Sequence, residues 1–172
     1  MADVELPEAK DPFEKGIALT IAIIAVVLSF VDNQGDNAKT DAIVKTNEAS
    51  NQWAYYQAKS LKGNLAESNA TLLAVLAPAD AAAAKAKLEE MTKDASRYEG
   101  EKKEIKTKAE ELQQEAAHAL AINDRCDQGS LLLQISVVLC SIAILVGWRP
   151  VFYAGAALGL VGAVIGISAF FM

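Results

Sequence analysis

The sequence predicts an all-α integral membrane protein with three transmembrane helices. A long antiparallel helical hairpin, coiled-coil-like, is expected between the first and second spans. Three segments, 16–31, 130–148 and 151–172, contain no charged residue, and 44 of their 57 residues are hydrophobic. Residues 32–129 instead combine frequent charge with small and apolar residues at heptad spacing, which is typical of paired helices.

The charge distribution and the scarcity of metal-binding side chains exclude several classes of protein. All 38 charged residues lie in the other 115 residues of the chain, whereas a soluble globular fold interleaves charge with its core. His118, Cys126 and Cys140 do not supply a tetrahedral metal site at a recognised spacing. The net charge of −6 argues against a nucleic-acid partner, which would need a basic patch. We therefore expect no enzyme, no metal and no cofactor.

An acidic tail, residues 1–15, precedes the first predicted transmembrane helix, residues 16–31. Residues 11–14, Asp-Pro-Phe-Glu, combine a capping residue, a first-turn proline and a capping-box acid, which together indicate a helix start. A cleaved signal peptide is the alternative, but its leading region should be positively charged. Residues 1–15 instead hold five acids and two lysines, so we interpret 16–31 as a span.

The second and third spans, 130–148 and 151–172, are separated only by a turn at Trp148-Arg149-Pro150. We expect Pro150 to end the second span, because proline interrupts a helix interior. Three spans place residues 32–129 on the side opposite the N-terminus. Basic residues at the N-terminal side favour a cytoplasmic N-terminus under the positive-inside rule, with residues 32–129 outside.

Two spans carry small residues at alternating spacings of four and three. Such seams allow helix backbones to approach closely in lipid, where apolar burial contributes little. Our hypothesis is that one seam packs against the other, within a protomer or between protomers. The alternative is that glycine and alanine are simply common in membrane helices. The seams comprise Gly155, Gly159, Gly162 and Gly166 in the third span, and Ala18, Ala22, Ala25 and Ser29 in the first.

The middle span contains polar residues on two faces. Gln134 and Ser141 share one face, and Ser136 and Cys140 share another. An intramembrane glutamine often bonds to a neighbouring helix or lines a transport path. Both interpretations stay open, and structural bonding is favoured because no acid, histidine or arginine accompanies Gln134 in the span.

Residues 32–129 are predicted to form two long helices, about 36–77 and 80–129, joined at Pro78. A three-residue break between heptad helices predicts an antiparallel hairpin. The predicted seam of the first helix is Ala54, Ala58, Leu61, Leu65, Ser68, Leu72 and Val75. That of the second is Ala84, Leu88, Met91, Ala95, Tyr98, Lys102, Ile105, Ala109, Leu112, Ala116 and Ala119.

Folding the hairpin at Pro78 places Gly100 opposite about Gln57, close to the aromatic residues Trp53, Tyr55 and Tyr56. One interpretation is that the glycine makes room for a large ring. The three aromatic residues do not all fit on one helix face, so at least one is a candidate contact for a partner. A simple packing layer within the hairpin is an equal alternative.

Residues 52–60, Gln-Trp-Ala-Tyr-Tyr-Gln-Ala-Lys-Ser, resemble the signature of a family of small bacterial membrane proteins known only as a domain of unknown function. The resemblance extends over nearly the whole chain and implies a bacterial source and an integral membrane location, which we take to be the inner membrane. It brings no activity, cofactor or catalytic residue. Members often have histidines after the first span, but residues 32–35 here are Asp-Asn-Gln-Gly, so a metal role there is not carried over.

These patterns favour a structural or accessory membrane protein that self-assembles or braces a larger complex. Its partners would be the lipid bilayer and either further copies of the chain or other subunits. The alternative is an oligomeric channel or transporter component, with Gln134 and Ser141 lining a path. A ligand sensor is a third class, which would need an output domain.

Overall fold

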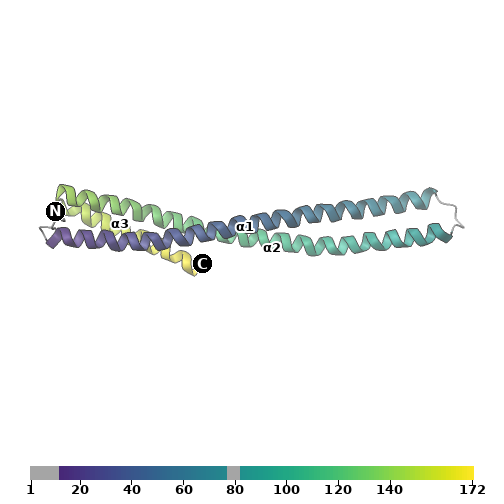
Figure 1. Ribbon diagram of the computed structural model, residues 1–172, viewed down its shortest axis with the longest axis horizontal. Helices are drawn as coiled ribbons and strands as arrows, with labels where there is room; N and C mark the ends of the chain where they lie inside the picture. Colours follow the sequence, from purple (N-terminus) through teal and green to yellow (C-terminus); the bar gives the residue numbers. More distant parts are fainter. Residues whose placement is uncertain (1–11, 77–81) are drawn as a thin grey trace, which may run out of the picture. The chain divides into compact units, whose positions relative to one another are not determined.

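A computed structural model describes residues 12–76 and 82–172, and all of its secondary structure is helical (Figure 1). Helix α1 spans Pro12–Leu76, α2 spans Ala82–Val146 and α3 spans Arg149–Ser168. A short 3-10 helix, η1, follows at Ala169–Phe171. Among the described residues, only Gly147, Trp148 and Met172 lie outside helices. The predicted all-α class is therefore confirmed.

Each of the three long helices contains a stretch long and apolar enough to cross a membrane. The stretches belong to α1 near the N-terminus, to α2, and to the segment Arg149–Phe171. Three predicted features fall wholly or mostly on residues 1–11 and 77–81, namely the acidic tail, the Asp11 cap and the Pro78 junction. They lie outside the described residues.

The chain divides into two units, which we describe separately. Unit 1 consists of Met1–Asp41 and His118–Met172, and unit 2 consists of Ala42–Ala117. The first two helices each contribute to both units, and α3 belongs to unit 1 alone.

The first helix has no boundary after the predicted span. The sequence predicts separate elements, a span at 16–31 and a helix starting near 36, whereas α1 continues without interruption through Asp32-Asn33-Gln34-Gly35. Asn37 donates a side-chain hydrogen bond to Asn33 one turn earlier, at 3.1 Å. A Cβ on Gly35 would lie 2.9 Å from Cβ of Cys126 on α2. Gly35 thus serves a close helix approach, at a propensity cost of about 1 kcal/mol.

The turn between α2 and α3 is set by Gly147 rather than by Pro150. Gly147 has a φ of 68°, the left-handed conformation that glycine adopts without penalty at a helix end. Its N–H donates to the carbonyl of Ala143 at 3.0 Å. Pro150 instead lies in the first turn of α3, where its missing N–H costs nothing. The expectation that Pro150 ends the second span was therefore wrong.

Unit 1 has a core made from one face of each of its helices. On α1 the most buried residues are Ile17, Ile24 and Val31, spaced seven apart. Ile24 and Val31 belong to a cluster that includes Leu133 of α2. Ile17 belongs to a second cluster, where Phe13 meets Phe152 edge-to-face at a centroid distance of 5.6 Å.

In unit 2 the predicted register of α2 agrees with its burial, but that of α1 does not. All eleven seam residues predicted on α2, from Ala84 to Ala119, are buried or half-buried, whereas the seven predicted on α1, from Ala54 to Val75, are all exposed. The observed α1 seam has the same 4–3 spacing but consists largely of small residues, which allow a close approach. The least exposed positions of this seam in unit 2 are Ala42, Lys45, Ala49, Gln52, Tyr56, Lys59, Gly63, Ala66, Ala70 and Leu73.

Candidate helix-assembly site

The four predicted glycines of α3 are buried, and a side chain at any of them would crowd its neighbours, most of all at Gly159, Gly162 and Gly166. A Cβ on Gly159 would lie 2.6 Å from Oγ of Ser136. On Gly162 it would lie 2.9 Å from the backbone oxygen of Gly129. Real Cβ contacts are not this short, so helix backbones meet here as expected of small-residue seams in membranes. Gly155 and Gly166 are likewise buried, against Cys140 of α2 and Val31 of α1.

The partner of this face is α2, through small residues that the sequence analysis passed over or treated as polar. A Cβ on Gly129 would lie 2.6 Å from Cα of Gly166. Ser136 is fully buried, and its hydroxyl donates to the carbonyl of Gly155 at 2.7 Å. The sequence signal was the seven-residue step from Gly129 to Ser136, which matches the step from Gly155 to Gly162.

The predicted alanine seam of α1 faces away from this contact. Ala18, Ala22, Ala25 and Ser29 are all exposed. The residues of α1 that meet the glycines are Ile24, beside Gly159, and Val31, beside Gly166. The within-chain form of the hypothesis, glycine seam against alanine seam, was therefore wrong.

The two polar faces of the middle span have different environments. Ser136 and Cys140 are buried, whereas Gln134 and Ser141 are exposed on the outer face of α2. The hydroxyl of Ser141 donates to the carbonyl of Val137 one turn earlier, at 2.8 Å. The side chain of Gln134 is thus on a surface that another helix or lipid would cover.

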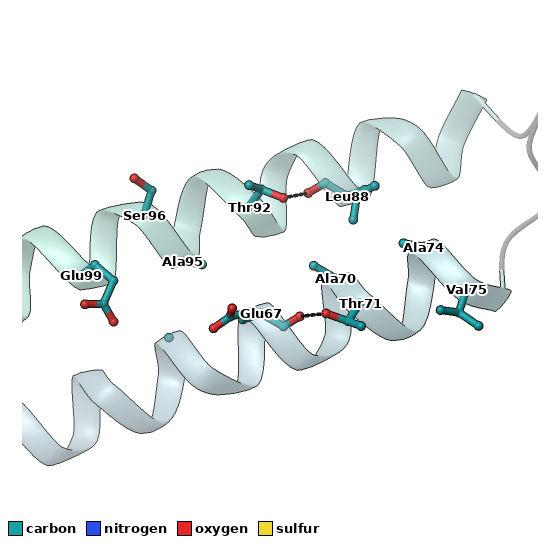
Figure 2. Close-up of a pocket in the computed structure, with 11 residues that line it drawn as sticks. Glu67, Ala70, Thr71, Ala74, Val75, Leu88, Thr92, Ala95, Ser96 and Glu99 are labelled. Carbon is teal, nitrogen blue, oxygen red and sulfur yellow. Dashed lines mark hydrogen bonds between the residues drawn. The ribbon is translucent and has the colours of Figure 1, made fainter.

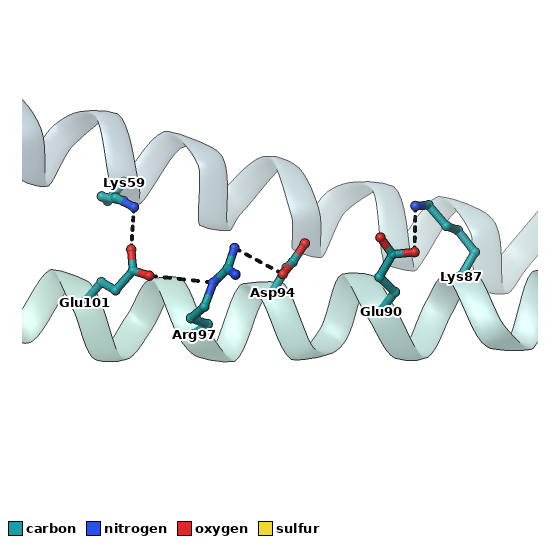
Figure 3. A network of polar contacts seen from close by, with 6 residues as sticks. All are labelled: Lys59, Lys87, Glu90, Asp94, Arg97 and Glu101. Atoms are coloured by element: carbon teal, nitrogen blue, oxygen red, sulfur yellow. Dashed lines mark hydrogen bonds and ion pairs between the residues drawn. The ribbon is translucent and has the colours of Figure 1, made fainter.

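In unit 2 the sequence motif at residues 52–60 forms a lysine–tyrosine clamp across the helix pair. Lys59 occupies a seam position and donates to the carboxylate of Glu101 on α2 (Figure 3). Its ammonium also lies 5.3 Å from the ring centroids of both Tyr55 and Tyr98, within the range of cation–π attraction. The Lys59 side chain is only 16% exposed, so little water competes with these contacts.

Further charges on α2 extend the clamp along that helix. Nε of Arg97 lies 3.6 Å from Glu101, and Nη2 of Arg97 lies 3.2 Å from Asp94 (Figure 3). The guanidinium also lies 5.1 Å from the ring centroid of Tyr98. The hydrogen bond from Lys59 holds the pKa of Glu101 below its ordinary value, and the same bond raises the pKa of Lys59.

Tyr56, which packs against Trp53, contacts a second seam lysine. Trp53 and Tyr56 pack edge-to-face with their centroids 5.6 Å apart. The ammonium of Lys102 lies 5.7 Å from the Tyr56 centroid and 2.6 Å from Glu99. Trp53 and Tyr56 are half-buried, while Tyr55 is the exposed member of the three.

Gly100 does not make room for these rings. A Cβ on Gly100 would have nothing within 4 Å, whereas one on Gly63 would lie 3.5 Å from Cβ of Tyr98. The expected pairing of Gly100 with about Gln57 was therefore wrong. The true register pairs Gly63 with Tyr98, so the opposing residues lie several positions from those inferred by folding at Pro78.

A third seam lysine makes a similar contact elsewhere in unit 2. Lys45 donates to the carboxylate of Glu115 at 2.5 Å. The bond holds the pKa of Glu115 below its ordinary value. Moving along α1 from Lys45 to Lys59 to Gly63, the partners on α2 step back from Glu115 to Glu101 to Tyr98. These contacts order the two helix segments in opposite directions.

A cleft of about 580 Å³ opens between the two helices of unit 2 beyond the clamp (Figure 2). Its walls are mainly short side chains, among them Ala70 and Ala74 of α1 and Ala95 and Ser96 of α2. Two glutamates, Glu67 and Glu99, also line the cleft, and Glu99 is paired with Lys102. The helices leave this space because the seam residues here are small and no lysine side chain fills the gap between them.

The contacts between helices differ between the two units. In unit 2, ion pairs and cation–π pairs join α1 to α2, and in unit 1 the helices approach closely at glycines. Within residues 12–76 and 82–172 there is no group of three or more His, Cys, Asp or Glu side chains that would hold a metal ion.

The comparisons with known proteins give one match. The model of the family described as Domain of unknown function (DUF4337) matches residues 13–172. No curated protein and no solved structure matches the chain.

Proposed function

The chain belongs to the family described as a domain of unknown function (DUF4337), and we propose that it is a structural or accessory integral membrane protein. In this proposal three spans anchor a helical hairpin, formed by the unit 2 parts of α1 and α2, at the membrane. The protein then self-assembles or braces a larger membrane complex. No enzymatic step, cofactor or nucleic acid is part of the proposal.

The observation that carries the proposal is the pair of cross-helix clamps, Lys59–Glu101 and Lys45–Glu115, at seam positions. Polar residues inside a heptad seam fix register and orientation at a cost in stability. A chain that maintains such a register over tens of residues has a defined surface to present. A scaffold needs a defined surface for its partners, whereas a simple membrane anchor does not.

The membrane part is proposed to take part in assembly through the outer side of α1. Ala18, Ala22, Ala25 and Ser29 are exposed and keep the 4–3 spacing of a packing seam. Within lipid this seam would let the α1 helices of two copies approach closely. This proposal differs from the seam hypothesis of the sequence, in which the alanine seam packs against the glycine seam, because the glycine face of α3 is buried within the chain.

The proposed location is the bacterial inner membrane, with the N-terminus in the cytoplasm and the hairpin on the opposite side. The support is that Lys10, Lys15 and Arg149 flank the membrane on the N-terminal side, whereas the equal number of basic residues on the other side, Lys39, Lys45 and Arg125, lie among aspartates. Labelling of a cysteine introduced at exposed Thr107 by an impermeant reagent in intact cells tests the orientation. Labelling that occurs only after the cells are lysed would place the hairpin in the cytoplasm and contradict the proposed orientation.

Co-isolation tests the functional proposal. Two copies of the full chain with different tags are expressed in the same cells, and one is isolated after mild detergent extraction. We expect the second tagged copy, or other membrane proteins at a fixed ratio, to accompany it. Mixing the two copies only after extraction is the control for contact formed in detergent. Isolation of the tagged chain alone would contradict the proposal.

A channel is the second candidate, because Gln134 and Ser141 lie together on the exposed face of α2. Several copies arranged with this face inward would have a polar stripe along their centre. The test is ion or solute flux into vesicles that contain the purified chain, compared with the Gln134→Leu variant. Flux that disappears in the variant supports the channel. Vesicles with the unsubstituted chain that are no more permeable than empty vesicles would exclude it.

A further inference from the structure

The seven exposed residues predicted as the α1 seam form a second regular stripe on unit 2, which we call the outer stripe. Its members are Ala54, Ala58, Leu61, Leu65, Ser68, Leu72 and Val75. The larger ones are far from buried: Leu61 is 69% exposed, Leu65 and Leu72 are 58% exposed and Val75 is 77% exposed. Four large apolar side chains in one row, interrupted only by Ser68, form an exposed apolar surface of the kind that marks an interaction site.

The spacing of the outer stripe specifies a helix as its occupant. Its members alternate steps of four and three, which is the repeat of a coiled-coil seam. The inner seam of α1 has the same repeat, so α1 has two heptad faces. The clamp residues Lys45, Lys59 and Gly63 occupy the inner face and pair with α2, and no contact of the described residues covers the outer one.

The charges beside the outer stripe favour a copy of the same helix as the occupant. In a parallel heptad pair, the residue before each a position faces the residue five positions later on the partner. Here these pairs are Gln57 with Lys62, Asn64 with Asn69, and Thr71 with Leu76. A parallel self-pair therefore puts no two like charges opposite each other.

The outer surface of α2 is a poor alternative occupant for this neutral stripe. Residues 82–117 contain 17 charged residues among 36, whereas residues 54–75 contain three, Lys59, Lys62 and Glu67, among 22. Pairing the outer stripe with that surface would place uncompensated charge against leucine, which is costly.

We propose that the outer stripe of α1 is the surface through which two copies of this chain pair, in parallel and in register. The inference rests on the proposed self-assembly and names its surface. The stripe is about 33 Å long at 1.5 Å per residue and covers roughly 330 Å² if a helix is about 10 Å wide. A typical stable interface buries about 800 Å² per partner. Anchoring in one membrane makes up the difference, because it raises the effective concentration of the second copy.

Cysteine cross-linking of the full chain in native membranes tests the proposal. Ser68→Cys and Leu61→Cys are made separately in a chain whose Cys126 and Cys140 are replaced by alanine. Parallel pairing in register brings each new cysteine opposite its own copy, so both variants should give a disulfide-linked dimer on mild oxidation. Thr107→Cys, an exposed hydroxyl-to-thiol change on α2, is the matched control and should stay monomeric.

The possible results distinguish failure of the proposed pairing surface from failure of the proposed self-assembly. If neither Ser68→Cys nor Leu61→Cys cross-links while differently tagged copies still co-isolate, the surface is wrong and self-assembly stands. Cross-linking at only one of the two sites indicates antiparallel pairing, and a cross-link to a different protein indicates another occupant; each overturns the proposal. If the tagged copies also fail to co-isolate, both the surface and the proposed self-assembly fail.

Discussion

At the scale of single residues, the ion pair between Lys59 and Glu101 makes stability depend on pH. Its hydrogen bond holds the pKa of Glu101 below the ordinary value of 4.5. A carboxylate with a lowered folded pKa stabilises the fold above the ordinary value, and this contribution is lost as pH falls through the folded pKa. The same reasoning applies to Glu115 beside Lys45.

We predict that Glu101→Gln lowers the thermal unfolding temperature at pH 7 and that the difference from the unsubstituted chain shrinks below pH 4.5. Helical circular dichroism in detergent, followed against temperature from pH 3 to pH 7, measures this. Glu110→Gln is the control, since it removes the same charge from an exposed pair with Lys106 on the same helix. A difference that stays constant across this pH range would show that the ion pair does not contribute as described.

The glycine contacts of α3 give a second prediction at this scale. Gly159→Leu should destabilise unit 1 by at least about 2 kcal/mol, because overpacked cores cost this much and Ser136 already occupies the space. Ala157→Leu adds comparable bulk on the exposed side of α3 and should be tolerated. Resistance to unfolding in denaturing detergent compares the two. Equal resistance would show that α3 does not pack on α2 through Gly159.

At the scale of elements, the two seams of unit 2 differ in how far sequence predicts them. The α2 seam combines apolar residues such as Ile105 and Leu112 with charges at most other positions, so its register was predictable. In unit 2 the α1 seam contains Lys45, Lys59 and Gly63, and its large apolar residues are few, whereas Leu61, Leu65, Leu72 and Val75 lie outside it. Ranking positions by hydrophobicity therefore selects the outer stripe. The true seam depends on close approach and cross-helix pairing, which one helix's sequence does not contain.

The membrane helices show the same difference between features that one helix's sequence contains and features that depend on a pair of helices. The glycine face of α3 was identified from spacing, because a missing side chain is visible in the sequence. Its partner surface was assigned to Ala18 and Ala22 rather than to Gly129 and Ser136, because shape complementarity between helices is a property of the pair. The continuity of α1 through Gly35 was missed for the same reason, since only the contact with Cys126 explains a glycine inside the helix.

The register of unit 2 gives the prediction for this scale. With Cys126 and Cys140 replaced by alanine, the double variant Gly63→Cys, Tyr98→Cys should form an intramolecular disulfide, because its Cβ atoms would lie 3.5 Å apart, within disulfide range. The pair Gln57→Cys, Gly100→Cys, which folding at Pro78 had placed opposite each other, should stay reduced. Gel mobility before and after reduction distinguishes them, and the reverse pattern would overturn the register.

At the scale of the whole molecule, the composition reflects two environments. The uncharged segments supply helices apolar enough for a membrane, and the charged remainder supplies a helix pair with lysine clamps. Small residues are used in both, since glycines 155 to 166 and the alanines of the α1 seam allow close helix packing. Both parts of the molecule are therefore built around contact between helices, which is why assembly is the proposed role.

The most direct test of that role is the native mass of the full chain after mild extraction from membranes. One chain has a mass of 18.3 kDa. We predict a discrete mass of two or more chains, or of one chain in fixed ratio with other subunits. A mass of 18.3 kDa alone, at every protein concentration and in several mild detergents, would contradict the account.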